Sequence, residues 1–181
     1  MRIIAGAWRG RPLLAPTGRA TRPTSDRARE GLFSMLASRI GSFEGLRVAD
    51  LFAGTGALGL EALSRGAAHC LFVESDRAAL EVLKRNVASL GAEDRSEVRA
   101  QAAEHSAPPD LPCDLVLMDP PYASDLAALV VERIADARWL APGGWVSVER
   151  ARSPLEIPEA FTLDIERRFG KASILLLRRK G

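Results

Sequence analysis

The chain has 181 residues, of which 47% are hydrophobic and 27% are charged. This length and composition are ordinary for one globular domain and leave no room for a second core of similar size. The two cysteines and two histidines are too few for a disulfide scaffold or a zinc site, so we expect no metal. No apolar run is long enough to cross a membrane, and the first residues do not resemble a signal peptide, which predicts a cytoplasmic protein.

The charge of the chain is unevenly distributed. The net charge is +2, but residues 1–31 contain seven arginines and two acidic residues, a net +5, which leaves −3 on the other 150 residues. A basic N-terminal segment on an acidic body indicates a polyanionic partner at that segment. On charge alone, a solvated surface without a partner is an equally good interpretation.

The N-terminal part of the chain divides into two segments. Residues 1–23 are rich in Gly, Pro and Arg and are predicted to form a basic arm or small hairpin, preceding a domain over residues 24–181. Thr24 or Ser25 is a candidate cap for a helix whose apolar residues follow at helical spacing. Gly41 and Gly45 mark the exit from this helix.

Beyond Gly45, predicted strands and helices alternate. Strands are expected at residues 46–52, 69–74, 96–100, 113–118, 145–149, 161–169 and 172–178, and helices at 57–65, 76–90 and 125–137. Asp76 can cap the second of these helices, and Gly91 can end it. The alternation predicts an α/β fold with a mainly parallel sheet and helices on both faces. The last two strands are joined too tightly for a crossover and are therefore expected to be antiparallel.

A glycine-rich turn follows the first strand of this unit. Gly54, Gly56 and Gly59 match G-x-G-x-x-G at a strand-to-helix junction, a pattern that brings a nucleotide close to the backbone but is weak by itself. Glu74 ends the next strand, 18 residues past Gly56. A carboxylate there can accept hydrogen bonds from both ribose hydroxyls. Together these features indicate a cofactor that contains adenosine.

Asp50 bears on which cofactor this is. A carboxylate directly before the turn opposes a pyrophosphate but suits the cationic ammonium group of S-adenosylmethionine. The alternative is a buried acid that binds amides of the turn, and both interpretations can hold together.

The segment Asp119-Pro120-Pro121-Tyr122 follows the predicted strand at residues 113–118. Its prolines stiffen the loop. The Asp119 carboxylate and the Pro120 carbonyl can accept both N–H bonds of an exocyclic amine, and Tyr122 can stack on the attached base. Asp119 can also take the proton that leaves. A base would have to be flipped or single-stranded to enter such a site.

In combination, these motifs resemble the class I S-adenosylmethionine-dependent amino-methyltransferases. The N-terminal stretches at residues 1–6, 8–11 and 21–33, together with residues 84–86 and 169–171, are similar to the bacterial RsmD family, which methylates the N2 amine of a guanine in 16S ribosomal RNA. This resemblance spans essentially the whole chain. It implies a Rossmann-like fold with seven strands, an enzyme that uses S-adenosylmethionine without a metal, and a small ribosomal subunit or its assembly intermediate as partner. A monomer is expected.

The resemblance also implies the roles of individual residues. The target guanine would be bound by Asp119, Pro120, Pro121 and Tyr122. The cofactor would be bound by Asp50, Phe52, Ala53, Gly54, Thr55, Gly56, Glu74, Ser75, Ala102, Ala103 and Thr24. The RNA would be contacted by Arg9, Arg11, Arg22, Arg27 and Lys171. Many relatives place a polar residue after the third strand to bind adenine, whereas residues 99–104 read RAQAAE, so backbone groups near Ala102 and Ala103 are expected to serve there.

Three other functions remain open at this point. The Asp-Pro-Pro-Tyr chemistry also suits adenine or cytosine amines in DNA, although the chain has no room for a separate DNA-recognition domain. A nicotinamide-dependent oxidoreductase could use the same glycine turn but would leave Asp50, the Asp119 loop and the basic arm unexplained. A noncatalytic RNA-binding module would leave the intact Asp119 loop unexplained.

Overall fold

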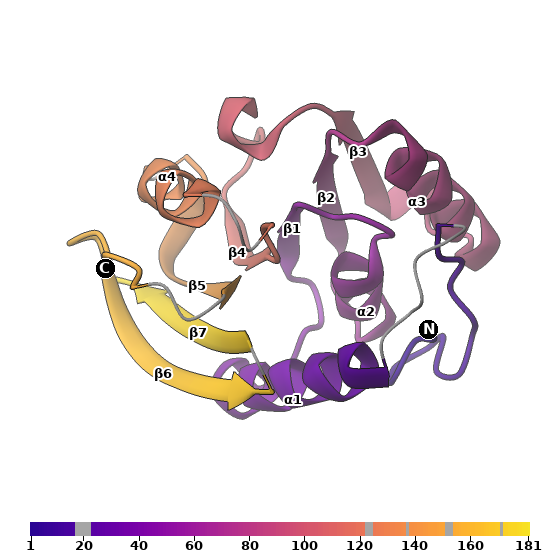
Figure 1. Cartoon of the computed structure of the whole chain (residues 1–181), viewed down its shortest axis with the longest axis horizontal. Helices are drawn as coiled ribbons and strands as arrows, with labels where there is room; N and C mark the ends of the chain where they lie inside the picture. The colour runs from indigo at the N-terminus through magenta and orange to yellow at the C-terminus, as the bar shows by residue number, and fades with distance from the viewer. Residues whose placement is uncertain (17–22, 122–124, 137, 151–153, 171) are drawn as a thin grey trace.

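The computed structural model describes residues 1–16, 23–121, 125–136, 138–150, 154–170 and 172–181. Its framework is one seven-stranded sheet in the order β3-β2-β1-β4-β5-β7-β6 (Figure 1). The strands are β1 (Arg47–Leu51), β2 (His69–Glu74), β3 (Ser96–Ala100), β4 (Cys113–Met118), β5 (Leu140–Arg150), β6 (Phe161–Phe169) and β7 (Ala172–Arg179). The α-helices are α1 (Pro23–Ile40), α2 (Ala57–Ser64), α3 (Arg77–Leu90) and α4 (Leu126–Ile134).

The first five strands of the sheet are parallel, and β7 alone runs in the opposite direction, between β5 and β6. Strand β1 lies between β2 and β4, with Leu51 in register with Val73 and Met118, and Met118 is in register with Val148 of β5. Strand β7 is antiparallel to both β5 and β6. The predicted fold class and the antiparallel C-terminal pair are therefore confirmed. The carboxyl ends of β2, β1, β4 and β5 meet side by side at one edge of the sheet.

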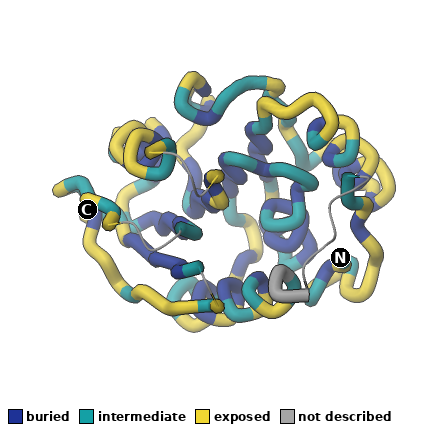
Figure 2. Tube along the Cα trace, in the orientation of Figure 1, coloured by how far each residue is buried: buried dark blue, intermediate teal, exposed yellow. Residues whose placement is uncertain are grey.

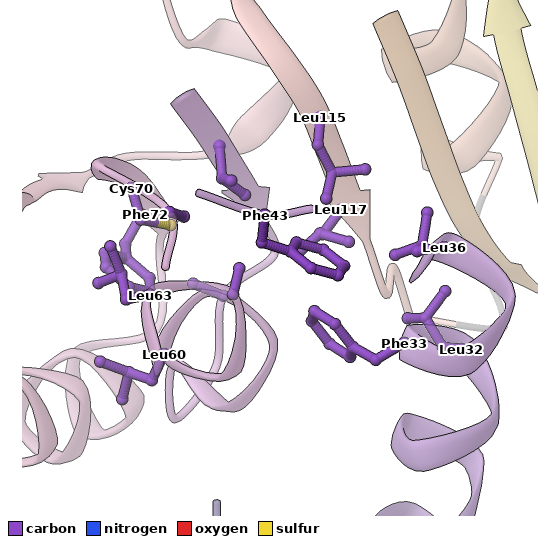
Figure 3. Close-up of a cluster of buried hydrophobic side chains, with 14 of the residues drawn as sticks. Leu32, Phe33, Leu36, Phe43, Leu60, Leu63, Cys70, Phe72, Leu115 and Leu117 are labelled. Atoms are coloured by element: carbon purple, nitrogen blue, oxygen red, sulfur yellow. The ribbon is translucent and has the colours of Figure 1, made fainter. Parts of the chain in front are cut away.

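Apolar packing covers both faces of the sheet. Helices α1, α2 and α3 contribute to one buried cluster, in which the rings of Phe33 and Phe43 lie 5.5 Å apart between centroids (Figure 3). Helix α4 packs on the other face, where Trp139 is the largest fully buried side chain. Figure 2 shows the central strands buried, while the outer surfaces of α3 and β6 are exposed. Two apolar faces explain why the buried residues of β1, β2 and β4 are apolar, with the exception of Asp50.

Helix α3 begins and ends at the predicted residues. The Asp76 carboxylate accepts a hydrogen bond from the Ala79 amide at 2.7 Å, which satisfies one of the free amides of the first turn. Gly91 ends the helix in the left-handed region at φ 64°.

Several other boundaries were predicted wrongly. Helix α1 begins at Pro23, so Thr24 and Ser25 lie inside its first turn rather than capping it; proline suits this position because it has no amide to leave unpaired. Strand β5 begins at Leu140, which pairs with Cys113, and a shift of register between Cys113 and Leu115 accommodates the expected turn at residues 142–144. Helix α4 ends at Ile134, and two short 3-10 helices, Glu93–Arg95 and Ala103–His105, were not expected.

Residues 1–13, which we call the N-terminal hairpin, fold back on themselves through an antiparallel bridge between Arg2 and Pro12. The Ile3 amide donates to the Arg11 carbonyl at 3.0 Å, and the Gly10 amide donates to the Ile3 carbonyl at 2.9 Å. Ile3 and Leu13 are buried in the same cluster as helices α1 and α2. The hairpin is therefore packed onto the domain. In the described part of the chain, no helix has the length and apolar character needed to cross a membrane.

Candidate active site

The turn between β1 and α2 has an unusual backbone. Phe52 has φ 75°, the one non-glycine residue with positive φ in the described part of the chain, and Gly54 and Gly56 have φ 54° and 82°. The amides of Phe52 and Ala53 both donate to the Val73 carbonyl of β2, at 3.1 and 3.0 Å. A non-glycine residue in this region costs free energy and is found preferentially at functional sites.

Space around the glycines explains their positions in this turn. A Cβ atom at Gly56 would lie 2.4 Å from the Leu83 side chain, whereas at Gly54 nothing lies within 4 Å of that position. Gly56 therefore permits close packing of the turn against α3, and Gly54 leaves the backbone open on its outer side. A ligand can approach this open backbone directly.

Glu74 is fixed beside the turn by three backbone amides. Its Oε2 atom accepts from Gly54 at 2.7 Å, and its Oε1 atom accepts from Ser75 at 2.8 Å and Asp76 at 2.7 Å. Because each carboxylate oxygen has two lone pairs and three of the four are used, Oε2 can accept one further hydrogen bond. The geometry therefore has room for a bond from one ribose hydroxyl, whereas the prediction assigned both hydroxyls to Glu74.

Asp50 is 1% exposed, and its Oδ2 atom accepts from the Gly59 amide at 2.9 Å. Burial raises the pKa of its carboxyl to about 7; the Gly59 hydrogen bond opposes this rise and the nearby Glu74 charge adds to it. Asp50 is therefore the buried acid that the second interpretation expected, bound to an amide in the first turn of α2. A cation placed beside it would favour the ionised form, as expected for an ammonium group.

Asp119 directly follows β4, between a buried strand and the buried ring of Pro120. Its side chain reaches the surface, but surrounding protein atoms desolvate the carboxyl and raise its pKa to about 7, and the charges of Glu149 and Asp50 raise it further. Pro121 is exposed. Tyr122 lies outside the described residues.

Four carboxylates thus gather at the carboxyl edge of four neighbouring strands. Asp50, Glu74, Asp119 and Glu149 stand at or near the ends of β1, β2, β4 and β5, and we call this set the acidic edge. Glu149 was not predicted, because the sequence does not reveal which residue of β5 lies beside β4. Burial is the main cause of the raised pKa values of Asp50 and Asp119, and repulsion from neighbouring carboxylates adds to it. A bound cation relieves this repulsion, and a pyrophosphate aggravates it.

Four of the remaining predicted cofactor residues follow strands at the same edge of the sheet. Thr55 is in the turn, Ser75 follows Glu74, and Ala102 precedes the short 3-10 helix that begins at Ala103 after β3. Thr24 is in the first turn of α1, and nothing further is described for its side chain.

The predicted RNA contacts fall into three groups. Arg9 and Arg27 are exposed and line one cavity. The Arg11 guanidinium donates a hydrogen bond to the Ser89 carbonyl of α3, which occupies part of its donor capacity. Arg22 and Lys171 lie outside the described residues.

Two fully buried polar residues to which the sequence assigned no role in the site connect the N-terminal hairpin to it. Glu61 of α2 accepts from the amides of Ile4 at 2.8 Å and Ala5 at 3.0 Å. Asn86 of α3 accepts from the Leu14 amide at 2.8 Å and donates to the Thr55 carbonyl at 2.9 Å. The sequence does show a polar residue within the apolar pattern of each helix, but it does not reveal which backbone groups that residue binds. The two side chains position the hairpin beside the glycine-rich turn.

The strand order, the left-handed turn and the acidic edge together define a class I methyltransferase. The same fold occurs in magnesium protoporphyrin IX methyltransferase from Synechocystis, solved with bound S-adenosylmethionine; the TM-score is 0.70 at 14% identity, covering 90% of this chain and 87% of that one. Residues 1–178 match the model of the family described as conserved hypothetical protein 95, and the chain belongs to this family.

Two relatives from Escherichia coli support the assignment. The chain is 38% identical over 186 residues to the ribosomal RNA small subunit methyltransferase D of strain K12, covering all of this chain and 91% of the relative. The solved structure of the putative methyltransferase yhhF superimposes with a TM-score of 0.88 at 37% identity, covering 100% of this chain and 98% of that one. The resemblance to the RsmD family that the motifs suggested is confirmed.

Proposed function

We propose that this enzyme transfers a methyl group from S-adenosylmethionine to the N2 amine of a guanine in 16S ribosomal RNA. The observation that carries the proposal is the Asp119-Pro120 loop, which stands at the acidic edge next to the strained turn after β1. A relative that matches the whole chain bears the name ribosomal RNA small subunit methyltransferase D, which supports ribosomal RNA as the substrate and the cytoplasm as its location.

The described residues fit the cofactor. The remaining lone pair of Glu74 Oε2 can accept from one ribose hydroxyl, and the open backbone at Gly54 permits close approach. Asp50 offers its negative charge to the ammonium group of the methionine part. When bound, S-adenosylmethionine supplies an electrophilic methyl group on a sulfonium.

The Asp119 loop would orient the amine and accept its proton. The Asp119 carboxylate and the Pro120 carbonyl accept the two N–H bonds of the guanine amine, which turns the nitrogen lone pair toward the methyl carbon. The new N–C bond forms as the S–C bond breaks, and the proton released from nitrogen passes to Asp119, whose raised pKa of about 7 makes it a competent base near neutral pH. Tyr122 is proposed to stack on the base.

The RNA is proposed to approach from the N-terminal hairpin, where Arg9 and Arg11 would contact phosphates together with Arg27 of α1. Arg22 and Lys171 are proposed as further phosphate contacts. The target guanine must leave its stack to enter. A chain of 181 residues recognises only a small part of such a substrate, so we propose that it acts on a small subunit or its assembly intermediate. We propose that it acts as a monomer.

The test is methyl transfer from labelled S-adenosylmethionine to small ribosomal subunits from a strain that lacks the corresponding gene. We expect label in N2-methylguanosine at a single site, identified by mass spectrometry of the nucleosides. Label only in DNA would instead support methylation of adenine or cytosine amines. No label in any nucleic acid, with the cofactor bound, would contradict the proposal.

The matched variants are Asp119→Ala in the site and Asp110→Ala in an exposed loop. We expect Asp119→Ala to abolish transfer while the cofactor Kd changes little, because Asp119 acts on the amine. Asp110→Ala should behave as the unchanged protein. Equal turnover of Asp119→Ala would contradict the role given to this residue.

A further inference from the structure

A cavity of about 450 Å³ lies between the N-terminal hairpin and the first two turns of α1. Arg2, Arg9 and Gly10 line it from the hairpin, and Asp26, Arg27 and Glu30 line it from α1. This volume is within the range of sites that bind small organic ligands, roughly 300–1,000 Å³. No role in cofactor binding or methyl transfer accounts for this cavity, which we call the hairpin cavity.

The two walls of the hairpin cavity are joined by a buried side chain. Arg29, 4% exposed, donates to the Arg2 carbonyl of the hairpin and pairs with Asp26 of α1 at 3.1 Å. Its Nε atom lies 3.8 Å from Glu61 Oε2, the same carboxylate that accepts from the hairpin amides. The cavity is therefore preformed, which reduces the entropy lost when a ligand binds.

The charged groups around the hairpin cavity have few internal partners. Arg2, Arg9 and Arg27 make no side-chain hydrogen bond or ion pair with any residue in the described part of the chain. By contrast, Arg65, Arg95 and Arg133 each contact a protein carboxylate or carbonyl. Three arginines with unused donors favour a phosphate.

The wall formed by α1 also contains two carboxylates, which would repel a ligand that consists of a phosphate alone. Asp26 uses one oxygen for Arg29, and Glu30 is exposed with no partner in the described part of the chain. Carboxylates accept hydrogen bonds from amino groups of nucleobases but repel a phosphate. A ligand with an anionic group and a neutral N–H edge satisfies both kinds of wall residue.

We propose that the hairpin cavity binds a second, non-target nucleotide of the RNA whose base carries an exocyclic amine. The nucleotide's phosphate lies against Arg2, Arg9 and Arg27, and its amine donates to Glu30 and the remaining oxygen of Asp26. Leu14, which follows the hairpin, is linked to Thr55 of the glycine-rich turn by hydrogen bonds through Asn86. A nucleotide bound here therefore fixes the RNA relative to the glycine-rich turn. This inference rests on the proposed RNA substrate.

The test is fluorescence anisotropy of the full chain with labelled nine-residue oligoribonucleotides of adenine, cytosine or uracil. Uracil is the reference because it lacks the exocyclic amine. We expect Arg9→Ala and Arg27→Ala each to weaken binding of all three probes by roughly 10- to 150-fold, the range of one charge-assisted contact. Arg138→Ala, an exposed arginine beyond α4, is the charge-matched control.

Glu30→Gln separates a nucleotide site from a phosphate site by the sign of its effect. We expect weaker binding of the adenine and cytosine probes relative to uracil, with Glu132→Gln on α4 as the control. Equal tightening for all three probes would show a simple anion patch and overturn the proposal, as would no change. These exposed positions leave folding intact, which Tm checks.

The closing measurement separates this proposal from the proposed function. The same variants are assayed for methyl transfer to small subunits, where we expect KM to rise and kcat to change little. Loss of transfer without any change in oligonucleotide binding would assign the cavity to a protein partner and overturn the nucleotide proposal. Failure of the unchanged protein to methylate subunits, with cavity-dependent oligonucleotide binding intact, would count against the proposed function alone.

Discussion

Asp50 is buried in the folded protein, where the loss of solvation disfavours the ionised form of its carboxyl. Its pKa is about 7 in the folded chain, against an ordinary value of 3.8, so between these values the folded protein retains a proton that the unfolded chain has released. The unfolded state binds fewer protons in this window, and the free energy of unfolding therefore decreases as the pH rises from about 4 to 7. The ionised Asp50 carboxylate, which suits a cationic ligand, therefore lowers the stability of the folded protein.

The first prediction follows from this conflict. Asp50→Asn keeps an acceptor for the Gly59 amide but removes the buried charge, so at pH 8 we expect the cofactor-free variant to be more stable than the unchanged protein, by up to about 4 kcal/mol. Cofactor affinity should fall at least tenfold because the ammonium loses its counter-charge. Urea unfolding at pH 5 and pH 8 and calorimetric titration measure the two effects. A variant that is less stable at pH 8 would contradict the account.

The second prediction concerns Asp119, whose ionised form is needed to accept the amine proton. With a pKa of about 7, the single-turnover rate at saturating cofactor should rise with pH and level off above about 7, falling about tenfold per unit well below it. Glu149→Gln removes a like charge that raises this pKa and should move the midpoint to lower pH. An unchanged midpoint in this variant would show that another group titrates.

At the scale of elements, the N-terminal hairpin depends on one close backbone approach. Gly6 has φ +85°, and a Cβ atom there would lie 1.9 Å from the Ser64 carbonyl oxygen of α2. The backbone of a helix cannot move aside for it. The Ala7 amide donates to this same oxygen at 2.7 Å, so the contact that excludes a side chain is also the one that attaches the hairpin.

The third prediction compares two glycines of the hairpin. Gly10 has a similar φ of +81°, but nothing lies within 4 Å of its Cβ position. Gly10→Ala should therefore destabilise by about 1 kcal/mol, the cost of the left-handed backbone alone. Gly6→Ala should cost about 3 kcal/mol or more, because the clash adds to that cost. Equal urea midpoints for the two variants would show that the hairpin is not held by α2.

The elements that could be predicted from sequence are those with local signals. Asp76 and Gly91 mark both ends of α3, and β4 ends in four consecutive buried apolar residues. The start of β5 was missed because Pro142 and its two glycines resemble a turn, whereas pairing with β4 extends the strand through them. Glu149, Glu61 and Asn86 were missed because their roles depend on which residues lie opposite, and only tertiary packing decides that.

At the scale of the whole molecule, charge is divided between two neighbouring regions. The acidic edge has four carboxylates around the glycine-rich turn, and the hairpin and the start of α1 have arginines next to this edge. The first region suits a cationic methyl donor and repels a phosphate backbone, and the second attracts that backbone. An RNA strand is therefore guided toward the arginines, and only a neutral base can enter the acidic edge.

The fourth prediction follows from this division. Binding to small-subunit RNA should weaken with salt, because each phosphate contact releases counterions and contributes about 0.7–0.9 to the slope of log Kobs against log salt. Replacing Arg9 and Arg27 together by alanine should therefore reduce the slope by about 1.4–1.8. The control pair, Arg133→Ala with Arg138→Ala, removes the same charge near α4. If both pairs change the slope equally, the RNA responds only to net charge, and the hairpin and α1 do not form the phosphate-binding surface.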